Sequence, residues 1–230
     1  MSKNIAIIPA RKGSKRIKNK NIKLFNGHPM ISWPIKIAIE SGIFDQVIVS
    51  TDSKKIANIA NSYGAITPFI RDKKLSDDFT PVKDVISDVI NKFDKREKHF
   101  DYVCCIFPCT PFLSKNDLKS TLKKLKKTKS NFLVPIAEYS HPIQRALKIT
   151  NKCNVIPENR KYLKSRTQDL SKFYYDTGSF YWGKSKSWKN KKNIFDNCTF
   201  VKIPNWRVFD IDNTDDWKRA EVFKKNLENK

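Results

Sequence analysis

Short runs of apolar, mostly β-branched residues recur along the chain, and the stretches between them carry apolar residues at helical spacing. Runs of this length are typical of strands that are buried on both faces of a sheet. We expect such strands at 5–8, 46–50, 102–107 and 132–137. The helical spacing predicts helices at 30–41, 54–63, 84–93 and 117–127. Strands that alternate with helices are typical of a mostly parallel sheet with right-handed crossovers.

The second half of the chain is less regular. Between about 139 and 176 neither period persists, and we expect a protruding hairpin or small subdomain there. Further short strands are predicted at 66–70, 178–182, 200–204 and 209–212, and a C-terminal helix at 215–227. Internal repeats, heptads and low-complexity linkers are absent from the sequence. We therefore expect a single α/β domain over 1–230 with an inserted element at about 139–176.

The composition fits one sizeable folded domain and raises a second class of function. With 39% hydrophobic and 12% aromatic residues, the chain has enough apolar surface for a core. Its net charge of +23 is typical of proteins that bind nucleic acid. The cations are mostly lysines spread over the whole chain, however, and the aromatic residues fall mainly inside predicted strands and helices. This distribution disfavours nucleic acid as the partner and favours attraction of small anionic substrates.

The sequence also bears on location. It contains no run of about 18 apolar residues, so no membrane-spanning helix is predicted and no membrane partner is expected. The N-terminus passes directly into the first strand pattern without the features of a secretory signal. The five cysteines show no CxxC spacing and are interpreted as reduced, structural thiols. We therefore expect a cytoplasmic protein.

The loop after the first strand is the first candidate for a binding site. Pro9 ends the strand, and Gly13 and Ser14 follow it. The loop also carries six cations: Arg11, Lys12, Lys15, Arg16, Lys18 and Lys20. Backbone N–H groups and fixed positive charge at the carboxyl end of a buried strand form a cradle for phosphate. The loop is neither a Walker A motif nor a dinucleotide fingerprint, and on its own it is equally compatible with a solvated basic turn.

A pair of carboxylates near the C-terminus is the second candidate. Asp210 and Asp212 are two residues apart in a predicted strand, so their side chains lie on one face while Ile211 points to the core. Two oxygen ligands that project together suit Mg²⁺, which completes its octahedron with substrate phosphates and water. The alternative is a surface acidic pair next to the last helix.

Three separated motifs, in this order, resemble one family. They are PARKGSKRIKNKNI at 9–22, VIVSTDSKKIANIA at 47–60 and FDIDNTDDW at 209–217. Together they resemble the cytidylyltransferases that activate nonulosonic acids, which are nine-carbon 2-keto sugar acids, and the resemblance runs from about residue 4 to residue 222. It implies a three-layer, Rossmann-like α/β fold of the nucleotide-diphospho-sugar transferase type with a small protruding dimerisation element, and hence a homodimer with sites near the interface.

The middle of the chain is most similar to the pseudaminate-activating branch of that family. The resemblance rests on CCIFPCTPF at 104–112, HPIQRAL at 141–147, RTQDL at 166–170 and YYDTGSFYWGK at 174–184. In the sialate-activating branch, a glutamine and an arginine that serve the sugar stand at the positions of Phe107 and Tyr175. Their replacement here favours a differently substituted nonulosonate. Legionaminate, sialate and 3-deoxy-octulosonate remain the alternative substrates.

The resemblance implies a reaction of CTP with a nonulosonic acid that gives the CMP-sugar and pyrophosphate, with Mg²⁺ as cofactor. It assigns catalysis to Arg11, Lys15, Lys20 and Asp212. Nucleotide binding is assigned to Ala10, Arg11, Gly13, Ser14, Asn21, Arg71 and Thr80. The sugar is assigned, on weaker similarity, to Gln144, Arg166, Gln168 and Tyr175, and the metal to Asp210 and Asp212.

The first loop departs from the family pattern at three positions. Lys12 stands where close relatives have glycine, and Lys18 and Asn19 replace a proline and often an arginine. The resemblance also implies that the inserted element reaches into the partner's site, so Arg166 is expected to serve the neighbouring active site.

Overall fold

A computed structural model describes residues 2–190 and 193–228, and its centre is a seven-stranded sheet. The strand order is β11-β6-β10-β5-β1-β4, and β9 pairs with β6 beside this path. The strands are β1 (Asn4–Pro9), β4 (Gln46–Ser50), β5 (Tyr102–Ile106), β6 (Phe132–Glu138), β9 (Tyr174–Asp176), β10 (Phe180–Lys184) and β11 (Cys198–Lys202). The strands predicted at 5–8, 46–50, 102–107, 132–137, 178–182 and 200–204 are therefore present.

The sheet is mostly parallel, as predicted. β1 runs parallel to both β4 and β5, and β11 runs parallel to β6. β10 is antiparallel to its neighbours β5 and β6. Along β1, Ile5 and Ile7 face one layer of helices, Ala6 and Ile8 face the other, and all four are fully buried.

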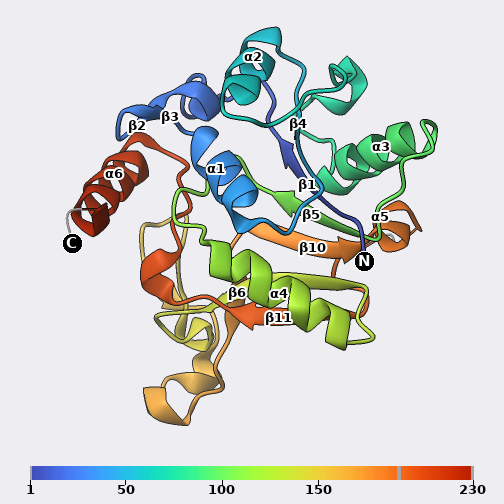
Figure 1. The fold of residues 1–230 in the computed structure, drawn as a ribbon. Helices are drawn as coiled ribbons and strands as arrows, with labels where there is room; N and C mark the ends of the chain where they lie inside the picture. Colours follow the sequence, from blue (N-terminus) through green and yellow to red (C-terminus); the bar gives the residue numbers. More distant parts are fainter. Residues whose placement is uncertain (1, 191–192, 229–230) are drawn as a thin grey trace.

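Helices cover both faces of the sheet and give the predicted three layers (Figure 1). One face packs against α1 (Ser32–Ser41), α2 (Lys54–Ser62) and α4 (Lys115–Lys127). The opposite face packs against α3 (Val82–Asp94) and α5 (Ser185–Asn190). Local signals set the helix starts: Ser53 caps α2, and Ser114 forms a capping box with Asp117 at the start of α4.

A third apolar cluster attaches the C-terminal helix α6 (Thr214–Glu228) to the region after β1. That region contains the small hairpin of β2 (Leu24–Phe25) and β3 (His28–Pro29), which turns through Asn26 and Gly27 at φ 45° and 79°. Figure 1 shows α6 beside this hairpin. The cluster contains Ile17, Phe25, Met30, Ile211, Trp217 and Ala220. It brings residues from the two ends of the sequence together.

Two predicted strands are wrong. Residues 66–70 form no strand, and Ile66 makes a single isolated bridge to Ile48. Residues 209–212 form no strand either: Ile211 is buried in the third cluster, and Phe209 stacks on Phe112 with a centroid separation of 4.4 Å. Side-chain packing and hydrogen bonds to Lys20 and Asp216 hold this segment, without pairing to a neighbouring strand.

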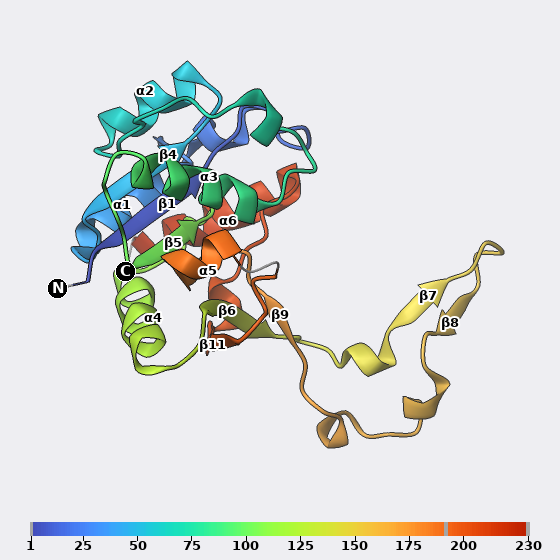
Figure 2. The ribbon, with the colours of Figure 1, turned by 90° about the vertical axis from the view of Figure 1, so that its right-hand side faces the viewer.

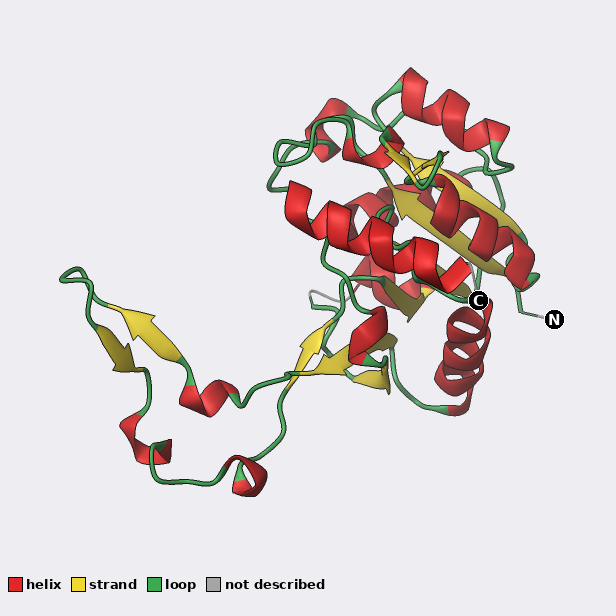
Figure 3. Ribbon diagram, turned by 90° about the vertical axis from the view of Figure 1, so that its left-hand side faces the viewer, coloured by secondary structure: helices red, strands yellow, loops and turns green. Residues whose placement is uncertain are grey.

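The segment between β6 and β9 extends away from the rest of the protein as an arm, defined here as residues 139–173 (Figure 2). Its tip is the hairpin of β7 (Leu147–Ile149) and β8 (Val155–Pro157), and the remainder is loops and single 3₁₀ turns (Figure 3). A hairpin was expected in this region.

Among the residues that the structure describes, no helix has both the length and the apolarity needed to cross a membrane.

Gly183 of β10 is a position in the sheet where the core leaves no room for a side chain. A Cβ there would lie 2.5 Å from Trp188 Nε1 and 2.6 Å from Phe132 Cδ1, and both rings are fully buried. We expect Gly183→Ala to lower the free energy of unfolding by about 1–3 kcal/mol, measured by urea denaturation. Gly13→Ala is the control, because a Cβ at Gly13 meets nothing within 4 Å. Equal stability of the two variants would contradict this packing.

Candidate active site

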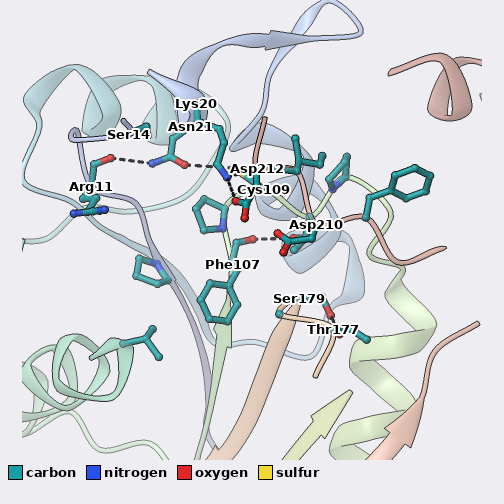
Figure 4. A pocket seen from close by; sticks show the side chains of 18 of the residues that line it. Arg11, Ser14, Lys20, Asn21, Phe107, Cys109, Thr177, Ser179, Asp210 and Asp212 are labelled. Atoms are coloured by element: carbon teal, nitrogen blue, oxygen red, sulfur yellow. Dashed lines mark hydrogen bonds and ion pairs between the residues drawn. The ribbon is translucent and has the colours of Figure 1, made fainter. Parts of the chain in front are cut away.

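A cavity of about 790 Å³ opens at the carboxyl end of β1 and β5. Five separate segments line it: the loop after β1, residues 71–85, the loop after β5, the turn before β10, and residues 203–212. In a sheet of mostly parallel strands, the loops at the carboxyl ends meet at one edge, which is where α/β proteins bind ligands. Figure 4 shows Arg11 on one side of this cavity, Asp210 and Asp212 on the other, and Lys20 between them.

On one side, the loop after β1 presents two cations to a single carboxylate. Arg11 Nη2 lies 2.5 Å from Asp78 Oδ1, and Lys15 forms an ion pair with the other oxygen of Asp78. Hydrogen bonds from Lys15 and Arg11 hold the pKa of the Asp78 carboxyl below its usual range. Arg11, Lys15 and Ser14, which the resemblance assigned to catalysis or nucleotide binding, all line the cavity.

On the other side, two more cations of the same loop contact the acidic pair. Lys20 Nζ donates a hydrogen bond of 2.6 Å to the carbonyl of Ile211 and lies 3.5 Å from Asp212 Oδ1. Arg16 Nη1 lies 2.5 Å from Asp212 Oδ2. Burial, and next the charge of Asp212, raise the pKa of the Asp210 carboxyl.

The chemistry of this acidic pair suits a hard divalent cation. Asp210 and Asp212 supply carboxylate oxygens at the cavity wall. The raised pKa of Asp210 means that ionising its carboxyl group is unfavourable there, and a bound cation would offset this cost. Within the described ranges, 2–190 and 193–228, no group of three or more His, Cys, Asp or Glu side chains has the arrangement to hold a metal. A cation held by this pair would therefore take its remaining ligands from substrate oxygens and water.

The shape of the first loop is fixed by side chains behind it. Asn21 is 6% exposed, and its Nδ2 donates to the carbonyl of Arg11 at 2.9 Å. The backbone N–H of Lys12 donates to Asp52 Oδ1 at 2.8 Å. Lys12, which departs from the family pattern, is thus accommodated through its backbone. Asp52, which follows β4 in the sequence, therefore supports the path of this loop.

Arg71 is the most deeply buried cation on the cavity wall. It is 5% exposed, its Nε donates to Ser76 Oγ at 3.2 Å, and its Nη2 is buried without a hydrogen-bond partner among the described residues. Burial is the main cause that lowers the pKa of this guanidinium. Thr80 also lines the cavity and donates to Asp77 Oδ1 at 2.7 Å. An unpaired buried donor is costly unless a ligand satisfies it.

Two predicted nucleotide contacts are not among the residues that line the cavity. Ala10 is fully buried in the core, and its N–H donates to the carbonyl of Ser50 at 2.9 Å. Gly13 lies in the first loop but is not among the residues that line the cavity. Both can influence a ligand through the path of the backbone, while their side-chain positions face elsewhere.

The predicted sugar contacts lie outside this chain's cavity. Gln144, Arg166 and Gln168 are on the arm, and Arg166 is paired there with Asp169 at 2.7 Å. Tyr175, on β9, packs against Tyr139 with a centroid separation of 5.0 Å. The cavity of the single chain is completed instead by Phe107, Cys109, Thr177, Ser179 and Tyr181. They belong to the motifs at 104–112 and 174–184, which was the signal available in the sequence.

An ion pair that the sequence did not reveal anchors the segment before Asp210. Arg207 donates to both oxygens of Asp117 and, at 3.0 Å, to the carbonyl of Phe112. Asp117 belongs to the capping box of α4, so the pair ties residues 203–212 to that helix. The two side chains are 90 residues apart in sequence, and neither position carries a local signal for the pairing.

Comparison with known proteins agrees with this geometry. The family model described as cytidylyltransferase matches residues 5–198. The chain is 42% identical over 97% of its length, and 97% of the relative's, to the pseudaminic acid cytidylyltransferase of Campylobacter jejuni subsp. jejuni serotype O:2. It is 30% identical, over 94% of both proteins, to the CMP-N,N'-diacetyllegionaminic acid synthase of Legionella pneumophila subsp. pneumophila.

A solved structure shares the fold at low sequence identity. The structure of CMP:2-keto-3-deoxy-manno-octonic acid synthetase complexed with CTP superimposes with a TM-score of 0.75 at 14% identity, and the match covers 98% of this chain and 100% of that one. At this identity the likeness concerns the fold alone. The family model and the relatives decide the assignment: the chain belongs to the cytidylyltransferase family.

Proposed function

We propose that this protein transfers CMP from CTP to the anomeric hydroxyl of pseudaminic acid and releases pyrophosphate. The observation that carries the proposal is the cavity in which a four-cation loop faces the pair Asp210 and Asp212. The 42% identity to a pseudaminic acid cytidylyltransferase over 97% of the chain favours pseudaminate over other nonulosonates. Legionaminate is the next candidate, because a 30% identical relative is a legionaminate-activating synthase.

In this reaction the sugar hydroxyl attacks the α-phosphorus of CTP, a new P–O bond forms, and the bond to the β-phosphate breaks. Such transfers need positioning and neutralisation of charge more than covalent help from the protein. Arg11 and Lys15 lie on the side where they would neutralise the phosphates, and Lys20 lies between them and the acidic pair. Ser14 Oγ and the loop N–H groups would hold further phosphate oxygens.

Asp210 and Asp212 would hold Mg²⁺ at the edge of the cavity. When bound there, the cation would supply charge neutralisation at the phosphates and make the sugar hydroxyl more acidic. Arg16 and Lys20 pair with Asp212 and so hold its carboxylate in place at the cavity wall.

Arg71, Asn21 and Thr80 would form the nucleoside end of the site. The buried Nη2 of Arg71 offers a donor without a described protein partner, and a buried donor of this kind gains most from a polar ligand atom. Asn21 would act mainly by holding the loop, because its amide already bonds the carbonyl of Arg11.

We further propose that the active form is a homodimer in which the arm serves the partner. Leu147, Ile149 and Val155 on its hairpin are 64%, 77% and 61% exposed, and apolar side chains grouped in this way favour burial against another surface. Gln144, Arg166 and Gln168 lie on the same arm, outside their own cavity. They would reach a sugar in the neighbouring site.

The five free cysteines are compatible with a cytoplasmic enzyme.

The substrate is tested directly with the purified protein, CTP and Mg²⁺. We expect pyrophosphate release with pseudaminic acid, slower release with legionaminic and sialic acids, and little with ATP in place of CTP. Release is measured with a coupled phosphate assay, and the CMP-sugar is identified by mass spectrometry. Silence with all three acids would refute the proposed function.

The metal site is tested with Asp212→Asn. Loss of one of two carboxylates should lower kcat by about 100-fold or more, because each charge-stabilising group of such a site contributes on that scale. Asp215→Asn is the control, because Asp215 is an exposed residue of the α6 first turn and is not among the cavity-lining residues. A near-wild-type kcat for Asp212→Asn would remove this residue from the metal site.

The dimer is tested at the arm hairpin. The wild-type protein should have about twice the 26.8 kDa chain mass in light scattering, and Ile149→Asp should be monomeric because a charge in an apolar interface is costly. Val222→Asp places the same charge on a residue of α6 that is 63% exposed and should leave the dimer intact. A monomeric wild-type protein, or an Ile149→Asp dimer of unchanged affinity, would contradict the role of the arm.

A further inference from the structure

The carboxylate of Asp78 lies where the first loop concentrates its positive charge. It contacts Arg11 through one oxygen, at 2.5 Å, and Lys15 through the other. The two partners are on the same loop and line the same cavity as Asp78 itself. A phosphate group at the same place could accept hydrogen bonds from both cations, as this carboxylate does. Asp78 belongs to the segment 72–80, which precedes α3 in the sequence.

The segment 72–80 is held together mainly by its own hydrogen bonds. Asp77 accepts from the N–H groups of Phe79 and Thr80 and from Thr80 Oγ1, and Asp72 accepts from the N–H of Lys74. Phe79, at the tip, is 90% exposed. The segment is therefore a small self-supported loop, and the ion pairs of Asp78 are its described polar links to the loop after β1.

We propose that Asp78 is an internal competitor for the phosphate groups of the nucleotide, so that binding of the phosphates to Arg11 and Lys15 displaces the segment 72–80 from the loop after β1. The inference rests on the proposed function, because it takes Arg11 and Lys15 to be the phosphate ligands. A single carboxylate carries less charge than a phosphate chain, so a triphosphate replaces it. Because a triphosphate and pyrophosphate must both displace Asp78 from Arg11 and Lys15, the carboxylate lowers the affinity of the site for both.

The energetics allow such an exchange. Lys15 is 80% exposed at its side chain, and Arg11 and Asp78 are 35% and 31% exposed. Ion pairs with this much solvent contact contribute little to stability and exchange readily. The charged groups next to Asp78 are its partners Arg11 and Lys15 and the neighbouring carboxylate of Asp77. Arg16 and Lys20, the other two cations of the loop that line the cavity, pair with Asp212 and not with Asp78.

The test measures binding of inorganic tripolyphosphate, pyrophosphate and CTP by calorimetry to the wild-type protein and to Asp78→Asn. Removal of the competing charge should tighten all three by about three- to tenfold, as expected for the loss of two partly exposed ion pairs. The matched control is Asp84→Asn, which removes the same charge from an exposed position in the first turn of α3, outside the cavity. It should leave the three affinities unchanged within about twofold.

Displacement of the segment is followed with Phe79→Trp, whose new indole lies next to Asp78. Tripolyphosphate should change its fluorescence, and the additional Asp78→Asn substitution should produce much of that change before the ligand is added. Affinities that are unchanged or weaker in Asp78→Asn would overturn the inference and make Asp78 a positioning residue for Arg11 and Lys15. Absence of tripolyphosphate binding in both proteins would overturn it as well.

These outcomes are independent of sugar transfer. A protein that binds tripolyphosphate more tightly as Asp78→Asn, yet forms no CMP-sugar, would refute the proposed function and leave the competition by Asp78 in place. Transfer activity with pseudaminic acid, together with unchanged tripolyphosphate affinity in Asp78→Asn, would do the reverse.

Discussion

The site depends on an apolar cluster that joins the loop after β1 to the C-terminal segment. Ile17 from the loop and Ile211 from the segment are 5% and 2% exposed, and both pack near Trp217 of α6. Burial of side chains of this size contributes roughly 1.5–3 kcal/mol each. Because Ile211 lies between Asp210 and Asp212, its burial fixes where the two carboxylates stand. Packing therefore sets the position of the acidic pair opposite the cationic loop.

Ion pairs between its cations and nearby carboxylates then order the loop after β1. Four of its cations contact carboxylates, with Arg11 and Lys15 on Asp78 and with Arg16 and Lys20 on Asp212. A loop of like charges would otherwise repel itself and a ligand would have to order it on binding. The carboxylates that order the loop are already paired with its cations. An anion that binds these cations must therefore be a better hydrogen-bond acceptor than a carboxylate. This condition favours polyphosphates over simple acids.

The parts of the fold that rest on local patterns could be predicted from the sequence. The buried strands at 5–8, 46–50 and 102–107 and the helices between them needed only apolar spacing, and β1, β4 and β5 lie adjacent and parallel. The strand predicted at 66–70 was wrong because Ile66 and Ile70 stay 43% and 47% exposed and only Ile66 makes a bridge, to Ile48. The strand predicted at 209–212 was wrong because Ile211 is buried among side chains from distant parts of the chain, which no short window records. β-propensity describes a side chain's surroundings more than its pairing.

The site shows the same division. The cationic loop and the acidic pair carry strong local signals, whereas Asp78, Asp52 and Asp117 act through partners 40 to 90 residues away or through a segment whose path is set by the fold. The arm is the extreme case. Gln144 and Arg166 could be matched to a family pattern, but the single chain carries them away from its own cavity. Their proposed role at the sugar is therefore tied to the proposed homodimer.

The net charge of +23 acquires a specific meaning from this arrangement. A positive surface attracts CTP, pyrophosphate and sugar acids alike, and it raises the rate of encounter without choosing among them. Selection among these anions must come from groups at the cavity. Such a group either lacks a hydrogen-bond partner or has an ion-pair partner that the anion must displace. The buried Nη2 of Arg71 rewards a ligand that satisfies it, and Asp78 penalises an anion too weak to replace it. Long-range attraction and local competition thus act on different steps, and the net charge is compatible with small-anion chemistry.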